Sequence, residues 1–307
     1  MNENEVIIVD GIPGGEYDKL IEESVKYAII SLPFTVDRMK IPNEKQRTLN
    51  IAKGKVAEAL FEYFCQKNDI SLDTEPCTTP FWTVDNRDFL LNNSEWDIKN
   101  NFLYHSGNVL ANHQYTDLPA LVPNRFTGDQ WSKRNTKMIG TSSNIEFLFT
   151  WLKGASLSNG KRGPYFLEII LTDDQHDCLR KLYKKYQGQP QTNEPYSADR
   201  FWNHMDSLGS NTYFKLNFRP ELIITAYAND NQWNLFKNTG PYDRDHNFGS
   251  YLNPQWYTKS QSGSLNFMNG TFWTRITNAT APTSTLPSFL SLFPHLSNSI
   301  NCGYIKP

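Results

Sequence analysis

The chain has 307 residues, a formal net charge of −2 at pH 7, and 20% charged residues. A chain of this length can bury a large core, and an aromatic content of 14% supplies apolar material for it. The near-neutral charge argues against a protein that coats polyanions by bulk electrostatics, although it leaves room for a local basic cleft. No linker composition marks a boundary, so we expect a single domain over residues 1–307.

The first residues and the cysteines bear on the location of the protein. The opening segment, MNENEVIIVDGIPGGEYDK, carries acids where a secretory signal carries positive charge, and its apolar run is short. No stretch approaches the roughly 18 apolar residues needed to span a bilayer. The cysteines are scattered without a CxxC pair, which argues against a zinc knuckle or a disulfide framework. We therefore expect a cytoplasmic protein that makes no membrane contact.

Two helices are expected in the first part of the chain. Residues 16–31 repeat apolar side chains at helical spacing, and we expect this helix to end before Pro33. Residues 47–66 predict a second helix with a single apolar face. On that helix Glu58 falls at the edge of the apolar arc, whereas Glu62 lies well out on the polar side. We therefore expect Glu58 to be the half-buried acid.

The rest of the chain predicts strands, loops and one more helix. Strand composition at 81–84, 88–91 and 94–104 is followed by a polar, irregular stretch at 105–143. Residues 144–152 and 164–172 resemble core elements around an Asn-Gly loop, 173–187 predict a helix, and 190–307 are mixed and β-rich.

Residues 88–99, DFLLNNSEWDIK, predict a β-hairpin with charged residues on one face. A two-residue turn at Asn92 and Asn93 would pair Leu91 with Ser94. In that register the large apolar side chains share one face, and a slip by one residue would break this pattern. The other face then carries three charged side chains, with the first two directly opposite each other: Asp88, Asp97 and Lys99.

Two carboxylates that face each other across a ladder repel, so the register requires a compensating charge. A divalent cation would provide it, with Lys99 assisting. Glu95 shares the face of Asp97 and could be the ligand instead.

A helix with a glutamate, a strand with an aspartate and then Asp-x-Lys on the next strand resemble the PD-(D/E)XK nuclease superfamily. Type II restriction endonucleases fit a chain of this length best, and the resemblance covers roughly residues 47–104. It implies the class α/β (α+β): a restriction-endonuclease-like core with a mixed central sheet flanked by helices and a large β-rich C-terminal elaboration. The catalytic core would span about 40–175, and elaborations at about 105–140 and 176–307 would recognise DNA.

The resemblance also implies roles for single residues. Asp88 and Asp97 would ligate Mg²⁺, for which Mn²⁺ can substitute, and Glu58 would join the metal site. Lys99 would stabilise charge on the attacking water and the scissile phosphate. The chain departs from the family in two places: Arg87 stands where proline is frequent, and the third-strand acid is Asp97 rather than a glutamate.

The activity implied is metal-dependent hydrolysis of phosphodiester bonds in double-stranded DNA. By analogy with enzymes that cut both strands, we expect a homodimer. The sequence has no GxxxxGK[ST] motif, so no nucleotide cofactor is expected. Arginine and glutamine suit base edges and lysine suits phosphate. The candidates for DNA contact in the loop at 123–137 are Arg125, Gln130, Lys133, Arg134 and Lys137, for which an ordinary solvated loop is an equal explanation.

Two other functions remain open at this stage. One is a nonspecific repair nuclease of the same superfamily. The other is a non-enzymatic β-rich protein whose aromatic, Asn-rich C-terminal half binds carbohydrate or single-stranded nucleic acid.

Overall fold

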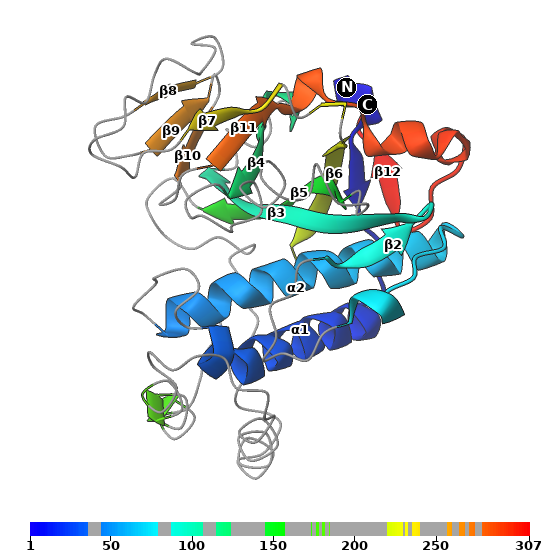
Figure 1. Cartoon of the computed structure of the whole chain (residues 1–307). Helices are drawn as coiled ribbons and strands as arrows, with labels where there is room; N and C mark the ends of the chain where they lie inside the picture. The colour runs from blue at the N-terminus through cyan, green and yellow to red at the C-terminus, as the bar shows by residue number, and fades with distance from the viewer. Residues whose placement is uncertain are drawn as a thin grey trace.

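The fold of the chain, taken from a computed structural model, is of the mixed α/β class with a sheet-rich core and two long helices (Figure 1). The two helices are α1 (Gly14–Thr35) and α2 (Glu44–Lys67). The structure describes residues 1–35, 44–78, 87–106, 115–123, 145–156, 220–229, 231–232, 235–239, 257–259, 264–267, 270–273 and 278–307, with six further residues between 173 and 184.

A six-stranded sheet forms the centre, in the order β12-β1-β6-β5-β3-β2. It is mixed, because β3 and β5 run parallel whereas the other neighbours are antiparallel. Its strands are β1 (Ile7–Val9), β2 (Phe89–Leu91), β3 (Ser94–Ser106), β5 (Ile145–Ser156), β6 (Glu221–Ala228) and β12 (Gly303–Ile305). Thus β1, β6 and β12 come from outside the 40–175 range in which we placed the catalytic core.

The central sheet lies between two layers. Helices α1 and α2 cover one face, where Val25 and Leu60 pack in one cluster with Leu148 of β5 (Figure 1). The neighbouring side chain on β5, Phe147, points to the other face and packs with Val122 in a second cluster. That second layer is the sheet β4-β11-β7, made of Pro119–Pro123, Asn278–Pro282 and Lys237–Thr239.

The remaining described elements are small. A separate three-stranded sheet contains β8 (Tyr257–Lys259), β9 (Ser264–Phe267) and β10 (Gly270–Trp273). The 3₁₀ turns are η1 (Glu3–Glu5), η2 (Glu75–Cys77), η3 (Tyr115–Asp117), η6 (Thr283–Thr285), η7 (Phe289–Leu292) and η8 (Pro294–Ser297). Among the helices that the structure describes, none has both the length and the apolar character that crossing a bilayer requires.

Several expected elements are confirmed, and two expectations were wrong. The helix expected at 47–66 is part of α2, but α1 continues past Pro33 to Thr35. A proline so close to the helix end removes only one late hydrogen bond, which the helix tolerates. The stretch 105–143 is not wholly irregular, because it contains β4. The expected elements at 81–84 and 164–172 lie outside the described residues.

Strand β4 escaped the sequence pattern because of its prolines. Pro119 and Pro123 stand at its two ends, and β4 pairs only with β11 among the described strands. Proline is compatible with strand ends and sheet edges because no ladder N–H is needed there. Strand β1 was missed for another reason: all of Ile7–Val9 is buried, so the strand shows no alternation of polar and apolar side chains.

The contact between β12 and β1 gives a test of the fold. A Cβ placed on Gly303 would lie 2.6 Å from the Ile8 carbonyl oxygen, so the strands could not keep their spacing. We expect Gly303→Ala to lower the free energy of unfolding by about 1–3 kcal/mol in urea denaturation. The control is Gly15→Ala, since no described residue comes within 4 Å of a Cβ there. Equal stabilities of the two variants would contradict this packing.

Candidate functional site: an acidic cluster at the sheet edge

The hairpin of β2 and β3 has the register that the sequence predicts. Leu91 pairs with Ser94 and Phe89 with Trp96, which confirms the two-residue turn. The turn residues Asn92 and Asn93 have φ angles of 51° and 63°. Asparagine tolerates this left-handed conformation, which a type I′ turn requires at both positions.

The apolar face of the hairpin packs against α2. Phe89 lies 5.2 Å from the ring of Phe61 on α2, measured between centroids, and 6.0 Å from the ring of Trp96. Ile98 packs against the same cluster. This packing holds the hairpin in register, because a one-residue slip would turn these rings away from the helix.

Asp97 and Lys99 point to the opposite face of the sheet. They are only 5% and 8% exposed and form an ion pair with each other. The Lys99 ammonium also lies 5.0 Å from the ring centroid of Phe147, which belongs to the cluster beneath the β4-β11-β7 sheet. The two charges are therefore removed from bulk water and depend on each other for stability.

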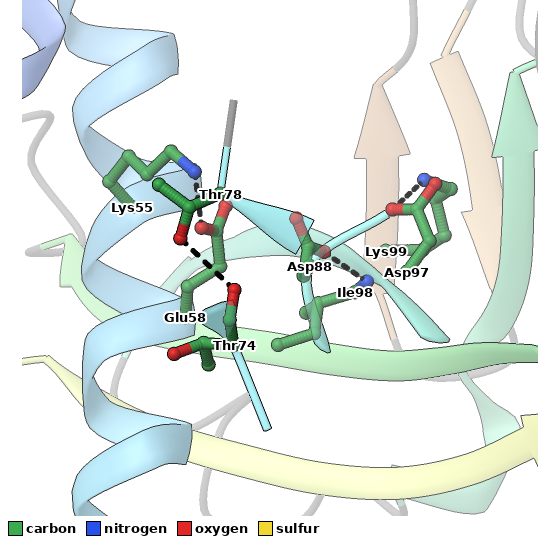
Figure 2. A network of polar contacts seen from close by, with 8 residues as sticks. All are labelled: Lys55, Glu58, Thr74, Thr78, Asp88, Asp97, Ile98 and Lys99. Atoms are coloured by element: carbon green, nitrogen blue, oxygen red, sulfur yellow. Dashed lines mark hydrogen bonds and ion pairs between the residues drawn. The ribbon is translucent and has the colours of Figure 1, made fainter. Parts of the chain in front are cut away.

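Asp88 lies at the edge of the sheet, just before β2 begins. Its backbone N–H donates to the Trp96 carbonyl at 2.7 Å, and its carboxylate accepts the Ile98 N–H at 2.6 Å. The carboxylate thus takes the place of a strand partner where the ladder ends. Figure 2 shows Asp88 between the Asp97–Lys99 pair on one side and α2 on the other.

Glu58 and Lys55 reach the site from α2. Their charged groups form an ion pair at 2.5 Å, with side chains 20% and 22% exposed (Figure 2). Lys55 Nζ also lies 4.8 Å from the ring centroid of Tyr27 on α1. Glu58 is half-buried as predicted, and Glu62 is exposed.

The charges of the cluster act on one another through Asp88. Burial raises the pKa of the Asp88 carboxyl well above its usual range, and the negative charges of Glu58 and Asp97 raise it further. The ammonium groups of Lys55 and Lys99 lower the pKa of Asp88 in return. Three carboxylates thus face two ammonium groups, so the cluster carries an excess of negative charge when all five are ionised.

The structure therefore brings together Glu58, Asp88, Asp97 and Lys99, the four residues singled out from the sequence. Lys55, which the sequence shows in a basic patch with Lys53, was not predicted to belong to the site, although its i, i+3 spacing to Glu58 was a usable signal. Its contribution to the site is direct, because it binds the carboxylate of Glu58.

The structure describes the alternative ligand Glu95 but not the proposed DNA-contacting residues. Glu95, the alternative ligand, forms an ion pair with Arg87, which also donates to the Pro76 carbonyl at 3.3 Å. The carboxylate of Glu95 is thus held by Arg87, which comes just before β2. The proposed DNA-contacting residues Arg125, Gln130, Lys133, Arg134 and Lys137 lie outside the described residues.

The donor chemistry of the cluster suits a hard cation, since all its candidate ligands are carboxylate oxygens. Its arrangement is not that of a formed metal site: among the described residues, no group of three or more His, Cys, Asp or Glu side chains could hold an ion. The Ile98 amide holds Asp88, while Lys99 and Lys55 hold Asp97 and Glu58. The carboxylates would have to leave these partners to converge on an ion.

Comparison of the chain with protein-family models, with curated proteins and with solved structures finds no match. The function of the cluster must therefore be inferred from its own residues and geometry.

The raised pKa of Asp88 predicts how stability depends on pH. The folded state binds the Asp88 proton more tightly than the unfolded state, so this carboxyl lowers stability as pH rises above its ordinary pKa of 3.8. Asp88→Asn keeps an oxygen acceptor for the Ile98 N–H but removes the charge. We expect a higher Tm than wild type at pH 7 and a difference that vanishes as the pH falls toward 4.

The matched control for Asp88→Asn is Asp69→Asn, at an exposed position two residues after α2. This variant should follow the wild-type Tm at both pH values. A lower Tm for Asp88→Asn at pH 7 would show that the ionised carboxylate stabilises the fold, against our electrostatic description.

Proposed function

We propose that the protein is a metal-dependent endodeoxyribonuclease with a restriction-endonuclease-like fold, acting on double-stranded DNA as a type II restriction enzyme. The observation that supports this most is the position of Asp88 between Glu58 on α2 and the Asp97–Lys99 pair on β3 (Figure 2). Phosphodiester hydrolysis requires acids that can hold a hard cation and a nearby cationic donor. The cluster contains both kinds of group.

In this proposal Asp88, Asp97 and Glu58 hold Mg²⁺, and Mn²⁺ can replace it. The bound ion would acidify a water molecule and neutralise developing charge on the phosphate. Lys99 is already held beside Asp97 by their ion pair. Once Asp97 turned toward the ion, the Lys99 ammonium would be available to the phosphate, where such a donor contributes about 3 kcal/mol to transition-state stabilisation.

The proposed nuclease also has an expected substrate, oligomeric form and cellular location. The substrate is duplex DNA, recognised in part through the loop at 123–137, and the working form is a homodimer located in the cytoplasm. Two copies related by a two-fold axis would place one catalytic centre on each strand.

A second candidate function is favoured by a specific observation. Asp97 and Lys99 are almost fully buried, and each carboxylate of the cluster already has a partner. A structural ion-pair cluster in a non-enzymatic protein that binds carbohydrate or single-stranded nucleic acid has the same features. Cleavage assays separate the two candidates.

The decisive test is cleavage of supercoiled plasmid DNA with Mg²⁺ or Mn²⁺. We expect wild type to cut, and Asp97→Asn and Lys99→Met to lose at least 100-fold in rate because they remove a ligand and a charge donor. The control is Asp69→Asn, an exposed acid just after the same helix, which should cleave normally.

Stability must be measured alongside activity, because losing one partner of a buried ion pair costs about 3–5 kcal/mol. Circular dichroism and Tm identify variants that remain folded at the assay temperature. Full activity in a folded Asp97→Asn or Lys99→Met variant, or an inert wild-type protein, would overturn the nuclease proposal. Discrete fragments would support sequence-specific cleavage, and a smear would favour the repair nuclease.

A further inference from the structure

Helix α2 has a glycine in its interior, Gly54, about one turn before Glu58 in the i, i+4 relation. Glycine inside a helix costs about 1 kcal/mol relative to alanine. Nothing in the described chain requires it: its φ angle is not positive, and no described residue comes within 4 Å of a Cβ placed there. The missing side chain therefore leaves open space beside the acidic cluster.

Two lysines flank this space. Successive residues of a helix are about 100° apart, so the side chains of Lys53 and Lys55 leave the helix on either side of Gly54. Lys55 contacts Glu58. The backbone carbonyl of Lys53 accepts a hydrogen bond from the side-chain amide of Asn100 on β3 at 3.4 Å. This turn of α2 thus lies directly against the strand that carries Asp97 and Lys99.

The same turn lowers stability in a second way. Burial lowers the pKa of Lys53 to about 8, so keeping this ammonium charged at neutral pH opposes folding. A glycine that lowers helix stability, and that no contact of the described residues requires, is typical of a functional site.

The charge pattern of α2 points to an anionic ligand. Residues 45–57 contain four basic residues and no acid, although they lie in the N-terminal half of the helix. The helix dipole acts on cations in the first turn only, so it does not account for Lys53 and Lys55 further along α2. Bound phosphates would pair with the ammonium groups of these two lysines.

We propose that Lys53, Gly54 and Lys55 form a phosphate-contact turn, at which the sugar–phosphate backbone of duplex DNA lies against α2 one turn from Glu58. This inference rests on the proposed nuclease function and adds a position for the substrate. The absence of a side chain at Gly54 permits close approach of the nucleic acid backbone. Lys53 and Lys55 then contact phosphates as point charges, which positions the strand without reading its sequence.

The test measures DNA binding without cleavage. A fluorescein-labelled duplex of mixed sequence is titrated with protein in EDTA at low salt, where sequence-independent binding is strongest, and anisotropy gives Kd. Gly54→Gln fills the space with a good helix former. We expect its Tm to equal or exceed that of wild type and its Kd to rise at least tenfold.

Two more variants accompany Gly54→Gln, and a third replaces it if it does not fold. Gly15→Gln fills open space on α1 rather than beside Lys53 and Lys55 of α2, and it should leave Kd unchanged. Lys53→Gln should reduce the slope of log K against log salt by about one, the value expected for one lost phosphate contact. If Gly54→Gln fails to fold, Gly54→Ala adds a single methyl group, and we expect a several-fold rise in Kd with a raised Tm.

The outcomes distinguish this inference from the proposed function. A folded Gly54→Gln variant that binds the duplex like wild type, while wild type still cleaves plasmid and Asp97→Asn does not, overturns the phosphate-contact turn alone. A wild-type protein that neither binds nor cleaves DNA overturns both proposals.

Discussion

The register of the β2–β3 hairpin is the constraint on which the acidic cluster depends. Two asparagines in left-handed conformation set the length of the turn, and rings on one face pack against α2. Either feature alone would leave the pairing free to slip, and together they permit one alignment. Asp88 is consequently held near Asp97 where the ladder ends, although the two carboxylates repel each other.

That repulsion is offset from two sides of the sheet. Lys99 neutralises Asp97 on the face that the β4-β11-β7 sheet covers, whereas Lys55 neutralises Glu58 on the face that the helices cover. Within the part of the chain that the structure describes, the Asp88 carboxylate has the Ile98 amide N–H as its hydrogen-bond partner and lies between the two pairs. The site is therefore a row of charges across a sheet edge, with its least compensated member in the middle.

The sequence predicted the local parts of this arrangement well. The type I′ turn and the half-buried position of Glu58 follow from periodicity and from the φ preferences of asparagine, which are short-range properties. The side of the sheet from which each group reaches Asp88 was not predictable, because it depends on which layer covers each face. The spacing of Lys55 to Glu58 was visible in the sequence, but its action on Asp88 was not, since Asp88 lies far away along the chain.

The elements missed from sequence were those whose pattern comes from tertiary surroundings. Strand β1 is buried on both faces, and β4 is bounded by prolines. The catalytic core was expected at about 40–175, and half the strands of the central sheet come from elsewhere in the chain. Only long-range pairing decides such membership, and no local window contains that information.

The outer edge of the sheet has a consequence for biosynthesis. Strand β1 lies between β6 and β12, so Ile7–Val9 must wait for Glu221–Ala228 and then for Gly303–Ile305 before both its sides are paired. Contacts so distant along the chain form slowly and carry a large loop-closure entropy. While the ribosome is still translating the chain, β1 remains an open edge, and the sheet closes only after residues 303–305 have emerged.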